Sequence, residues 1–462
     1  MESFTVIGAG LSGLTVASEL AALGHRVTVI ERSAAVGGLA RTFRYADRSF
    51  DVGPHRFHTD DARVEAWIAG ALGGELLTIE RRSAVQAFGR VHDWPLRPRV
   101  LASLPLGTLA RAALDLLRRP ASEGESFEAE MRSRYGATLY EAFFEPYTRR
   151  FLEVAPASLH RDWGRAGVDR AVIDRRRRIS GLPGLLRSTL FPPPVETVFR
   201  YPAAGIGRLA ERLAERLTAA GGRLLLGRTI EAIEVEADRV VALRTGHERL
   251  DAGVVVWTAP LTTASRLLGV DAGGLRFRST LLFNLALARP ARVDQQWIYF
   301  AEEPAFVRVS LPTAFSAAAA PPGAGALGVE RTCVEGDADW RGAESLVPDV
   351  VAGLVRARVI GDAGDVESVH VERVADSYPV YTLGYREARD ACLAALGRHR
   401  NLLLAGRCGR YWYNNMDHTI GQALSIADQL AAGRAPPEVD VGRLDFWCGQ
   451  GEGAAGSDEA GR

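Results

Sequence analysis

A glycine-rich turn near the start of the chain carries the clearest chemical signal. Its residues follow the order G-x-G-x-x-G, with Gly8, Gly10 and Gly13 at the glycine positions. Gly8 permits a tight turn, Gly10 lets the backbone approach a pyrophosphate, and Gly13 allows a helix to pack closely on a strand. A helix that begins at such a turn offers unpaired N–H groups and a partial positive charge to phosphate. The turn therefore predicts a dinucleotide site.

The flanking elements are those that a dinucleotide site needs. An apolar run of strand type precedes the turn, and a helical pattern follows it from about Leu11, with Ser12 in the first turn. A second apolar strand over 26–30 ends at Glu31, a carboxylate placed to accept a ribose hydroxyl. A lone G-x-G-x-x-G is a weak signal, but the strand, helix, second strand and acid complete the unit. We therefore predict a Rossmann-like α/β domain.

A second glycine site identifies the dinucleotide. The chain continues E-R-x(4)-G-G-x-x-R-T, from Glu31 and Arg32 through Gly38 and Leu39 to Arg41. A glycine pair just past the ribose acid lets the backbone run close beside a long, extended ligand, and the Arg41 guanidinium can reach phosphate. FAD stretches across a whole domain and uses such a second site, whereas a nicotinamide dinucleotide does not need it. We therefore predict FAD as the cofactor.

These motifs resemble the large FAD family that includes amine oxidases, protoporphyrinogen oxidases, phytoene desaturases and UDP-galactopyranose mutases. The loop G-P-H-x-F-H-T, which starts with Gly53, Pro54 and His55, resembles more narrowly the mutase loop beside the isoalloxazine ring. The resemblance makes these three residues cofactor contacts, with His55 shaping the site rather than acting as a general base. The loop has two histidines three residues apart, but no further His/Cys cluster accompanies them, so we predict no metal site.

A late stretch resembles the mutase closing motif G-R-x(3)-Y-x-Y-x-x-M-D. A buried strand ends near Gly406, and a helix over 419–430 follows, whose N-terminus can hold the ribityl and pyrophosphate end of FAD. In mutases an arginine separates the two tyrosines, whereas this chain has Trp412 there. The resemblance implies that Tyr411 and Tyr413 face the substrate. It implies cofactor contacts for Gly406, Arg407, Met416, Asp417 and Thr419.

Other candidate site residues lie between these motifs. Arg308 interrupts an apolar strand and resembles a mutase arginine that binds the sugar diphosphate, although it can also be an edge-strand charge. Tyr378, in a Y-P-V turn, resembles a tyrosine that reaches phosphate, with a buried aromatic as the equal alternative. Tyr147 belongs to a Y-T segment after which mutases carry a tryptophan, where this chain has Phe151 and Leu152. In relatives the residue matching Ile230 contacts adenine through its backbone. The arginines Arg165, Arg170 and 175–178 are read as a solvated surface or, alternatively, a phosphate clamp.

Composition limits the possible partners. The formal net charge is zero, so we expect no nucleic-acid partner. The chain contains no lysine, which excludes Schiff-base chemistry and a lysine general base. Four scattered cysteines without C-x-x-C fit a reducing compartment. The chain shows neither a signal-peptide pattern nor an apolar run long enough to span a bilayer, so we expect a cytoplasmic protein with no integral membrane segment.

The pattern along the chain predicts a discontinuous cofactor domain. Three segments, 1–96, 200–265 and 395–440, are predicted to build the FAD-binding domain. Residues 97–199 are helical in pattern and predict an insertion. Residues 266–394 alternate as strands and predict an antiparallel-sheet substrate domain. Residues 449–462 predict a disordered tail, and a homodimer is left open.

The resemblance to mutases implies a particular reaction. In those enzymes reduced flavin attacks the anomeric carbon of a nucleotide sugar, the nucleoside diphosphate leaves, and the sugar re-closes with the other ring size before it recombines. The protein's part is to neutralise the diphosphate with arginines and to orient the substrate with tyrosines. The sequence has no Ser-His-Asp set and no obvious carboxylate pair, in agreement with this division of labour. We therefore predict a pyranose/furanose mutase acting on a nucleotide sugar.

Two other functions remain open. An FAD-dependent oxidoreductase of the protoporphyrinogen oxidase or amine oxidase type (an oxidase, dehydrogenase or desaturase) would act on a sugar-bearing or other small molecule. Amine oxidases of this family generally hold a water beside the flavin with a lysine, which this chain lacks. The departures at Trp412 and Leu152 favour a substrate other than UDP-galactose. A non-catalytic carrier, such as the GDP-dissociation inhibitors, has the same fold but lacks the complete FAD motif set.

Overall fold

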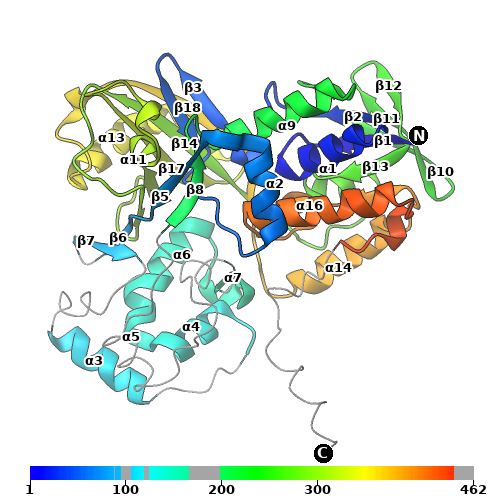
Figure 1. Ribbon diagram of the computed structural model, residues 1–462. Coiled ribbons are helices and arrows are strands. Elements are labelled where there is room, and N and C mark those ends of the chain that lie inside the picture. Colours follow the sequence, from blue (N-terminus) through cyan, green and yellow to red (C-terminus); the bar gives the residue numbers. More distant parts are fainter. Residues whose placement is uncertain (88, 95–105, 119–123, 165, 167–197, 442–462) are drawn as a thin grey trace, which may run out of the picture.

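Two large sheets organise the described part of the chain. The computed structural model describes residues 1–87, 89–94, 106–118, 124–164, 166 and 198–441 (Figure 1). One sheet has five strands and the other has seven. A helical segment, drawn in cyan in Figure 1, lies at one end of the molecule below the two sheets. Arg165, Arg170, the arginines 175–178 and the predicted tail 449–462 lie outside the described residues.

The five-stranded sheet is parallel and draws its strands from three distant parts of the chain. Its order is β19-β13-β1-β2-β9. The strands are β1 (Ser3–Ile7), β2 (Arg26–Ile30), β9 (Arg223–Leu225), β13 (Val254–Trp257) and β19 (Leu402–Leu404). Val6, Val29 and Val256 pack on one face against α1 (Leu11–Ala22), α9 (Gly207–Ala219) and α16 (Met416–Ala431). Because both faces are covered, the central strands read as continuous apolar runs.

A smaller antiparallel sheet covers the opposite face. Its strands are β10 (Ala232–Glu236), β11 (Arg239–Thr245) and β12 (Glu248–Asp251). Val240 joins the same core cluster as Ile7 and Val255 of the parallel sheet. Asn401 fastens the two sheets, since its Nδ2 donates to the carbonyls of Val240 (2.7 Å) and Gly253 (2.6 Å) and its Oδ1 accepts the Val240 N–H (2.8 Å). One buried amide thus satisfies three backbone groups.

The seven-stranded sheet is mixed rather than purely antiparallel. Its order is β18-β14-β17-β16-β15-β6-β7, and only the β15–β6 pair is parallel among the described pairings. The strands are β6 (Ser83–Ala87), β7 (Arg90–Trp94), β14 (Phe277–Leu287), β15 (Trp297–Phe300), β16 (Arg308–Ser310), β17 (Gly325–Cys333) and β18 (Val366–Pro379). The sequence placed 83–94 in the first segment of the cofactor domain, whereas the structure pairs it with β15. Local patterning predicts strands but not their distant partners.

The two faces of this sheet differ in chemistry. Leu281, Phe283 and Leu285 of β14 pack into an apolar core with α13 (Val347–Arg356). The intervening Asn284 points to the other face and is fully buried there. Because side chains alternate along a strand, Arg308 and Glu330, which pair across β16 and β17, share that second face. The polar face is the one available to a ligand.

The helical segment contains the predicted helices with one interruption. Its elements are α3 (Leu106–Leu117), α4 (Phe127–Tyr135), α5 (Ala137–Leu139), a π-helical turn over Tyr140–Phe144, α6 (Glu145–Leu152) and α7 (Asp162–Gly164). The sequence pattern predicts one helix over 138–150, and the π turn divides it. Such single π turns are frequent near functional sites.

Shorter elements connect these layers. They are the hairpin β3 (Thr42–Tyr45) and β4 (Arg48–Asp51), the pair β5 (Leu76–Glu80) and β8 (Val198–Pro202), and the helices α2 (Ala62–Leu72), α10 (Leu261–Leu267), α11 (Pro312–Phe315), α12 (Ala338–Arg341), α14 (Tyr385–Leu396) and α15 (Gly406–Gly409). No helix in the described part of the chain combines the length and apolar character that crossing a lipid bilayer requires.

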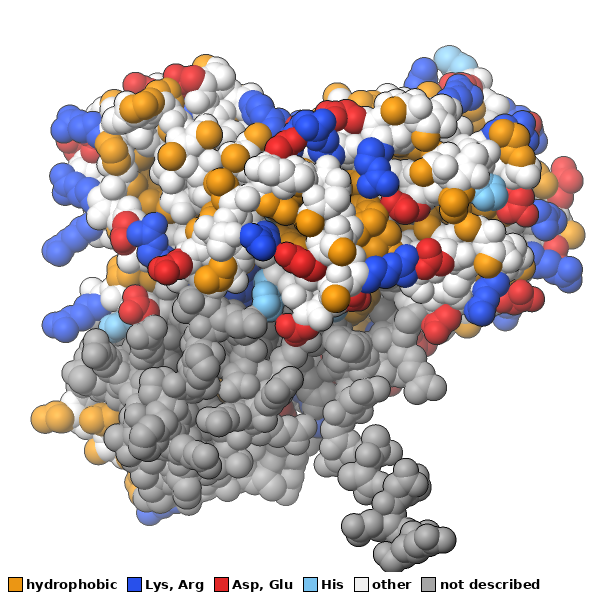
Figure 2. Space-filling model, in the orientation of Figure 1, with side chains coloured by type: hydrophobic (Ala, Val, Ile, Leu, Met, Phe, Trp, Pro, Cys, Tyr) orange, Lys and Arg blue, Asp and Glu red, His pale blue; other side chains and the backbone are white. Residues whose placement is uncertain are grey.

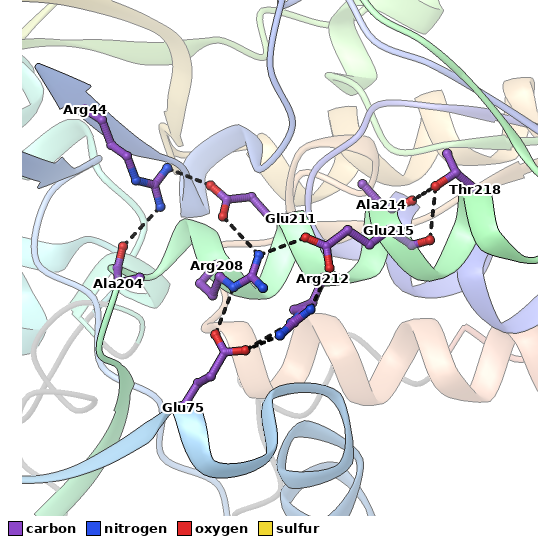
Figure 3. A network of polar contacts seen from close by, with 9 residues as sticks. All are labelled: Arg44, Glu75, Ala204, Arg208, Glu211, Arg212, Ala214, Glu215 and Thr218. Atoms are coloured by element: carbon purple, nitrogen blue, oxygen red, sulfur yellow. Dashed lines mark hydrogen bonds and ion pairs between the residues drawn. The ribbon is translucent and has the colours of Figure 1, made fainter.

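Charged side chains of both signs are interspersed over the face seen in Figure 2. On α9 they form a network (Figure 3) in which Arg208 and Arg212 both contact Glu75. Arg208 also donates to Glu215 (2.9 Å). Arg44 of the hairpin donates to Glu211 (2.7 Å). These groups lie at the surface in contact with solvent, so each pair contributes little to the free energy of folding. The network orients α9 against the hairpin rather than supplying most of its stability.

Replacing Asn401 by alanine is expected to destabilise the protein by about 3 kcal/mol, because three buried backbone groups lose their partner. Denaturant unfolding measures the change. Asn415, which is exposed and makes no side-chain cap at the start of α16, is the matched control, and its replacement by alanine is expected to change the unfolding free energy little. Equal effects of the two substitutions would contradict the fastening role of Asn401.

Candidate functional site

The glycine turn forms a tightly packed cradle at the end of β1. Gly8 has a left-handed backbone (φ 104°), which favours glycine. A Cβ at Gly13 would lie 2.0 Å from the Gly8 carbonyl oxygen, so only glycine lets α1 approach the turn. A Cβ at Gly10 would meet no atom within 4 Å, so open space lies beside this residue. This packing is compatible with a pyrophosphate cradle, and the contact of the three glycines with the cofactor stays a prediction.

A second glycine pair lies across the cradle. Gly37 and Gly38 both have left-handed backbones (φ 110° and 54°). The Gly37 N–H donates to the Ala9 carbonyl (2.8 Å), and a Cβ at Gly38 would lie 3.3 Å from Gly10 Cα. The two loops therefore run side by side, as a long ligand held between them requires. Leu39 follows in a short 3₁₀ turn.

The turn at Gly406 packs against the start of α1, beside the glycine cradle. Gly406 has φ 74°, and a Cβ there would lie 2.8 Å from the Ser12 Cβ. Ser12 Oγ is buried in the first turn of α1 and has no protein partner among the described residues. Asn414 Nδ2, just before α16, is likewise buried without one. Buried polar atoms normally have partners, so these donors and the open space at Gly10 fit an FAD pyrophosphate and ribityl chain.

The start of α16 contains the remaining closing-motif residues. Met416 and Asp417 are half-buried in its first turn, and Asp417 Oδ1 lies 3.1 Å from His418 Nδ1. Thr419 donates to Asn414 Oδ1 (3.0 Å). The helix N-terminus presents unpaired N–H groups toward the ligand side.

The acid at the end of β2 is already engaged by the backbone. Glu31 accepts the Ala9 N–H (2.8 Å) with one carboxylate oxygen and the Ser33 N–H (2.8 Å) with the other. Each oxygen keeps a second lone pair for a ribose hydroxyl. Ile230, predicted to meet adenine, is buried nearby in the core cluster that also contains Ile30. Both contacts stay predictions.

The two arginines of this motif make different contacts. Arg41 donates to Ser33 Oγ (3.1 Å) and lies over the Phe43 ring. Arg32 is exposed and pairs with Asp376 of β18 (3.6 Å), and its predicted contact with the cofactor stays a prediction. A groove of about 580 Å³ lies between the hairpin and α9, and its lining includes Arg41 but none of the cradle glycines. The groove therefore adjoins the cofactor cradle without forming it.

The loop after β4 lies against an ion pair on the seven-stranded sheet. Arg308 donates from Nε and Nη2 to the two oxygens of Glu330 (2.6 Å each), and Nη2 also lies 2.9 Å from the Tyr378 hydroxyl. A Cβ at Gly53 would lie 2.9 Å from Glu330 Oε1 and 3.1 Å from Arg308 Nη2. The backbone of this loop, residues 53–59, which we call the flavin loop, therefore contacts the Arg308–Glu330 pair directly. Pro54 and His55 follow, both half-buried.

His55 is neutral in this setting. Burial lowers the pKa of His55 to about 4, a hydrogen bond with the Gly53 carbonyl opposes the shift, and the nearby Arg308 and Arg407 guanidiniums add to it. Nδ1 lies 3.0 Å from that carbonyl oxygen, so Nδ1 carries the proton and Nε2 is left as an acceptor. A neutral His55 can accept a hydrogen bond but holds no second proton to donate near neutral pH.

Tyr147, Tyr378 and Tyr413 lie in one aromatic cluster. Phe151 stacks on Tyr147 (ring centroids 5.7 Å apart) and meets Tyr378 edge-on (4.8 Å), and Tyr378 meets Tyr413 (5.7 Å). Arg407 Cζ lies 4.3 Å from the Tyr413 ring centroid and 5.2 Å from that of Tyr378. Burial raises the pKa of Tyr147 and of Tyr378, so both phenols stay protonated. The cluster offers hydroxyls and cation–π contacts beside the flavin loop.

Tyr411 does not face this cluster. It is fully buried, and its hydroxyl lies 2.7 Å from the Arg276 carbonyl and 2.8 Å from that of Val380. The structure therefore corrects the expectation that Tyr411 contacts substrate. Its left-handed backbone (φ 52°) turns the side chain into the core, which residue spacing does not reveal. Trp412, at the position where mutases have arginine, is also buried.

Sequence reasoning missed Glu330, the partner of Arg308. It interrupts the apolar strand β17 as Arg308 interrupts β16, so the same criterion applied to both strands would have found it. Arg56 and Arg81 were also missed. Both lie near the Trp297 ring, and burial lowers the pKa of Arg81 to about 10, with a further contribution from Arg56. Several guanidinium groups therefore lie in and around the loop that contains Arg56.

Comparisons with known proteins agree with this cofactor site. A family described as flavin containing amine oxidoreductase matches residues 11–430. A probable UDP-galactopyranose mutase from Klebsiella pneumoniae is 29% identical over 168 residues, which cover 34% of this chain and 43% of that protein. A phytoene dehydrogenase from Streptomyces griseus is 26% identical over 301 residues, which cover 58% of this chain and 56% of that protein. The matched parts span about half the length of these relatives.

A solved structure of reduced UDP-galactopyranose mutase has the same fold. It superposes with a TM-score of 0.81 over 97% of both chains, at 20% sequence identity. At that identity the likeness shows the architecture alone. The family match over 11–430 gives FAD as the cofactor, and the assignment of the glycine cradle as the place that holds it stays a prediction.

Two alanine substitutions are expected to separate packing from cofactor binding. Gly10→Ala adds a Cβ into open space, so the protein should fold but lose FAD affinity, because that space is needed by the pyrophosphate. Gly13→Ala forces α1 away from the turn and should reduce soluble, folded protein as well. Bound flavin per chain and thermal unfolding measure the two effects. A Gly10→Ala protein with full FAD content would contradict the assignment of the cradle.

The neutral state of His55 predicts a pH effect on stability. Its folded pKa lies below the unfolded value of about 6.5, so the unfolded chain binds the extra proton and stability is lost as pH falls from 6.5 toward 4. Between pH 7 and pH 5 the wild type is expected to lose about 1–2 kcal/mol more than His55→Gln. Asp51, whose pKa burial raises to about 6, titrates with the opposite sign but is common to both proteins. Parallel pH profiles for the two proteins would refute a neutral His55.

Proposed function

The chain belongs to the family of flavin-containing amine oxidoreductases and binds FAD, and from that premise we propose that it interconverts the ring forms of a nucleotide-linked sugar. The observation that carries the proposal is the kind of side chain gathered beside the flavin loop. Guanidiniums, protonated phenols and a neutral imidazole gather there, all suited to binding and orienting an anionic, hydroxyl-rich substrate. The carboxylate described against the loop, that of Glu330, is engaged by Arg308 in a bidentate pair.

Reduced flavin supplies the nucleophilic nitrogen that such a reaction needs at the anomeric carbon. The protein then has to hold a sugar diphosphate in line with it. Arg407, which lies against the Tyr378 and Tyr413 rings, is placed to neutralise phosphate, and the phenols are placed to orient sugar hydroxyls. His55 Nε2 offers an acceptor to a hydroxyl or ring N–H without adding charge.

One observation favours a second candidate, net oxidation of a sugar-bearing or other small molecule. Arg308 was expected to anchor a diphosphate, but Glu330 compensates its charge in a buried bidentate pair. A compensated guanidinium attracts a dianion less than a free one does. Trp412 also removes a charge that mutases place between their tyrosines. A less anionic substrate that gives hydride to the flavin would suit this arrangement.

Dependence on a reductant is expected to distinguish the two reactions. The purified flavoprotein should convert a UDP-, dTDP- or GDP-hexose to the other ring form only after chemical reduction of FAD, with no net oxidation, because the attacking nitrogen is nucleophilic only in reduced flavin. Chromatography of the products measures ring conversion and any net oxidation, and the flavin absorbance band shows whether FAD is reduced.

Two outcomes would contradict the mutase. One is bleaching of the bound flavin by a substrate without added reductant, followed by peroxide formation in air, which supports the oxidoreductase. The other is no turnover of any nucleotide hexose by the reduced protein at full flavin content. The Gly10→Ala protein is the matched control, since any reaction that needs bound FAD must fail in it.

A further inference from the structure

A short helix of the helical segment reaches the aromatic cluster. This helix, α7, contains Trp163, which is 6% exposed. The indole stacks on the Tyr413 ring, with centroids 5.5 Å apart and planes inclined by 14°, and on the Phe151 ring at 5.9 Å. Trp163 thereby joins two stretches of chain that are more than two hundred residues apart. The motif that contains it, His160-Arg-Asp-Trp163, has no role in the function proposed above.

Tyr413 is the link between Trp163 and the cofactor side. Arg407 Cζ lies 4.3 Å from the Tyr413 ring centroid, and the Tyr413 N–H donates to the Tyr381 hydroxyl (2.7 Å). The backbone of Tyr413 is therefore held independently, while its ring is oriented by the indole and the guanidinium. A parallel aromatic neighbour restricts ring rotation and stabilises the stacked orientation beyond the effect of burial.

A buried carboxylate fixes α7 in this position. Asp162, 2% exposed, accepts hydrogen bonds from the Tyr385 hydroxyl (2.7 Å) and from Arg386 Nε (2.8 Å), and lies 3.1 Å from His160 Nδ1. Burial opposes ionisation of Asp162, but the His160 and Tyr385 hydrogen bonds and the Arg386 guanidinium outweigh it and hold its pKa below the usual range. The His160 N–H also donates to the Tyr381 carbonyl (2.7 Å).

This anchor defines geometry more than it adds stability. A buried ion pair gains little net free energy, because desolvation offsets the attraction between its charges. It does, however, restrict the two elements to one relative arrangement. Tyr385 and Arg386 belong to α14, which leads into strand β19 of the cofactor sheet. The anchor therefore ties the helical segment to the FAD-binding part of the chain beside Tyr413.

We propose that Trp163 is a positioning residue, held by Asp162, that sets the orientation of the Tyr413 ring and, through it, of the Arg407 guanidinium beside the flavin. The proposal rests on FAD binding and holds for either reaction considered above. It gives the helical segment a direct part in shaping the cofactor environment.

Visible circular dichroism of the bound flavin tests the proposal, because this signal reports the fixed neighbours of the ring. Trp163→Leu keeps much of the bulk but removes the stack, and should alter the visible dichroism of fully loaded holoprotein. Trp163→Phe keeps an aromatic face and should retain most of the wild-type spectrum. Trp340→Leu is the matched control, since Trp340 is half-buried in the core of the other sheet. Its visible spectrum should stay that of the wild type even if its thermal stability falls.

An unchanged visible spectrum in loaded Trp163→Leu, or an equal change in Trp340→Leu, overturns the proposal. Should Trp163→Leu fail to fold, Arg386→Gln provides the second test, because Arg386 is partly exposed and pairs with the Asp162 carboxylate. It should produce a change of the same sign and smaller size. A wild-type spectrum in Arg386→Gln holoprotein with full flavin content then overturns the proposal on its own.

Discussion

The contact between α1 and the turn after β1 is the constraint on which the rest of the structure depends. A Cβ at position 13 would lie only 2.0 Å from the Gly8 carbonyl oxygen, so the helix can approach the strand only because Gly13 has no Cβ. This approach directs the N-terminus of α1 across the end of the parallel sheet. The loops at Gly37–Gly38 and Gly406 then pack against the same helix start. Three distant stretches of chain thus meet at one edge of the sheet, where parallel strands of open α/β sheets place their ligands.

The second sheet completes the site through the alternation of its side chains. Its apolar face forms a core of its own, so the polar residues on the opposite face lie against the cofactor domain. Arg308 and Glu330 are buried there as a pair, with Tyr378 as a third partner. An unpaired charge at that depth would be strongly unfavourable. The pair therefore keeps a guanidinium beside the loop at Gly53 with its charge largely compensated.

The described part of the helical segment contributes aromatic surface to the cluster. Tyr147, Phe151 and Trp163 extend from it toward Tyr378 and Tyr413 of the other layers. Leu152, at the position where a tryptophan was expected by resemblance, instead lies in the core. Trp163, eleven residues further along the chain, places an indole against Tyr413 in the aromatic cluster. The aromatic cluster therefore contains an indole, which comes from α7 and not from the Y-T segment.

Local patterns in the sequence were sufficient for the cofactor but not for the substrate side. The order of strand, glycines, helix and acid determines a dinucleotide site because each residue acts within its own turn, and the second glycine pair extends that reasoning to FAD. Most predicted strands and helices of the two sheets also appear in the structure, for the same local reason. The pairing of 83–94 with β15, the compensation of Arg308 by Glu330, the burial of Tyr411 and the stack of Trp163 on Tyr413 were decided only by tertiary structure. Each of these four features depends on which side chains from distant parts of the chain come to lie together. Residue spacing and composition do not give that information, because it arises only when the layers pack.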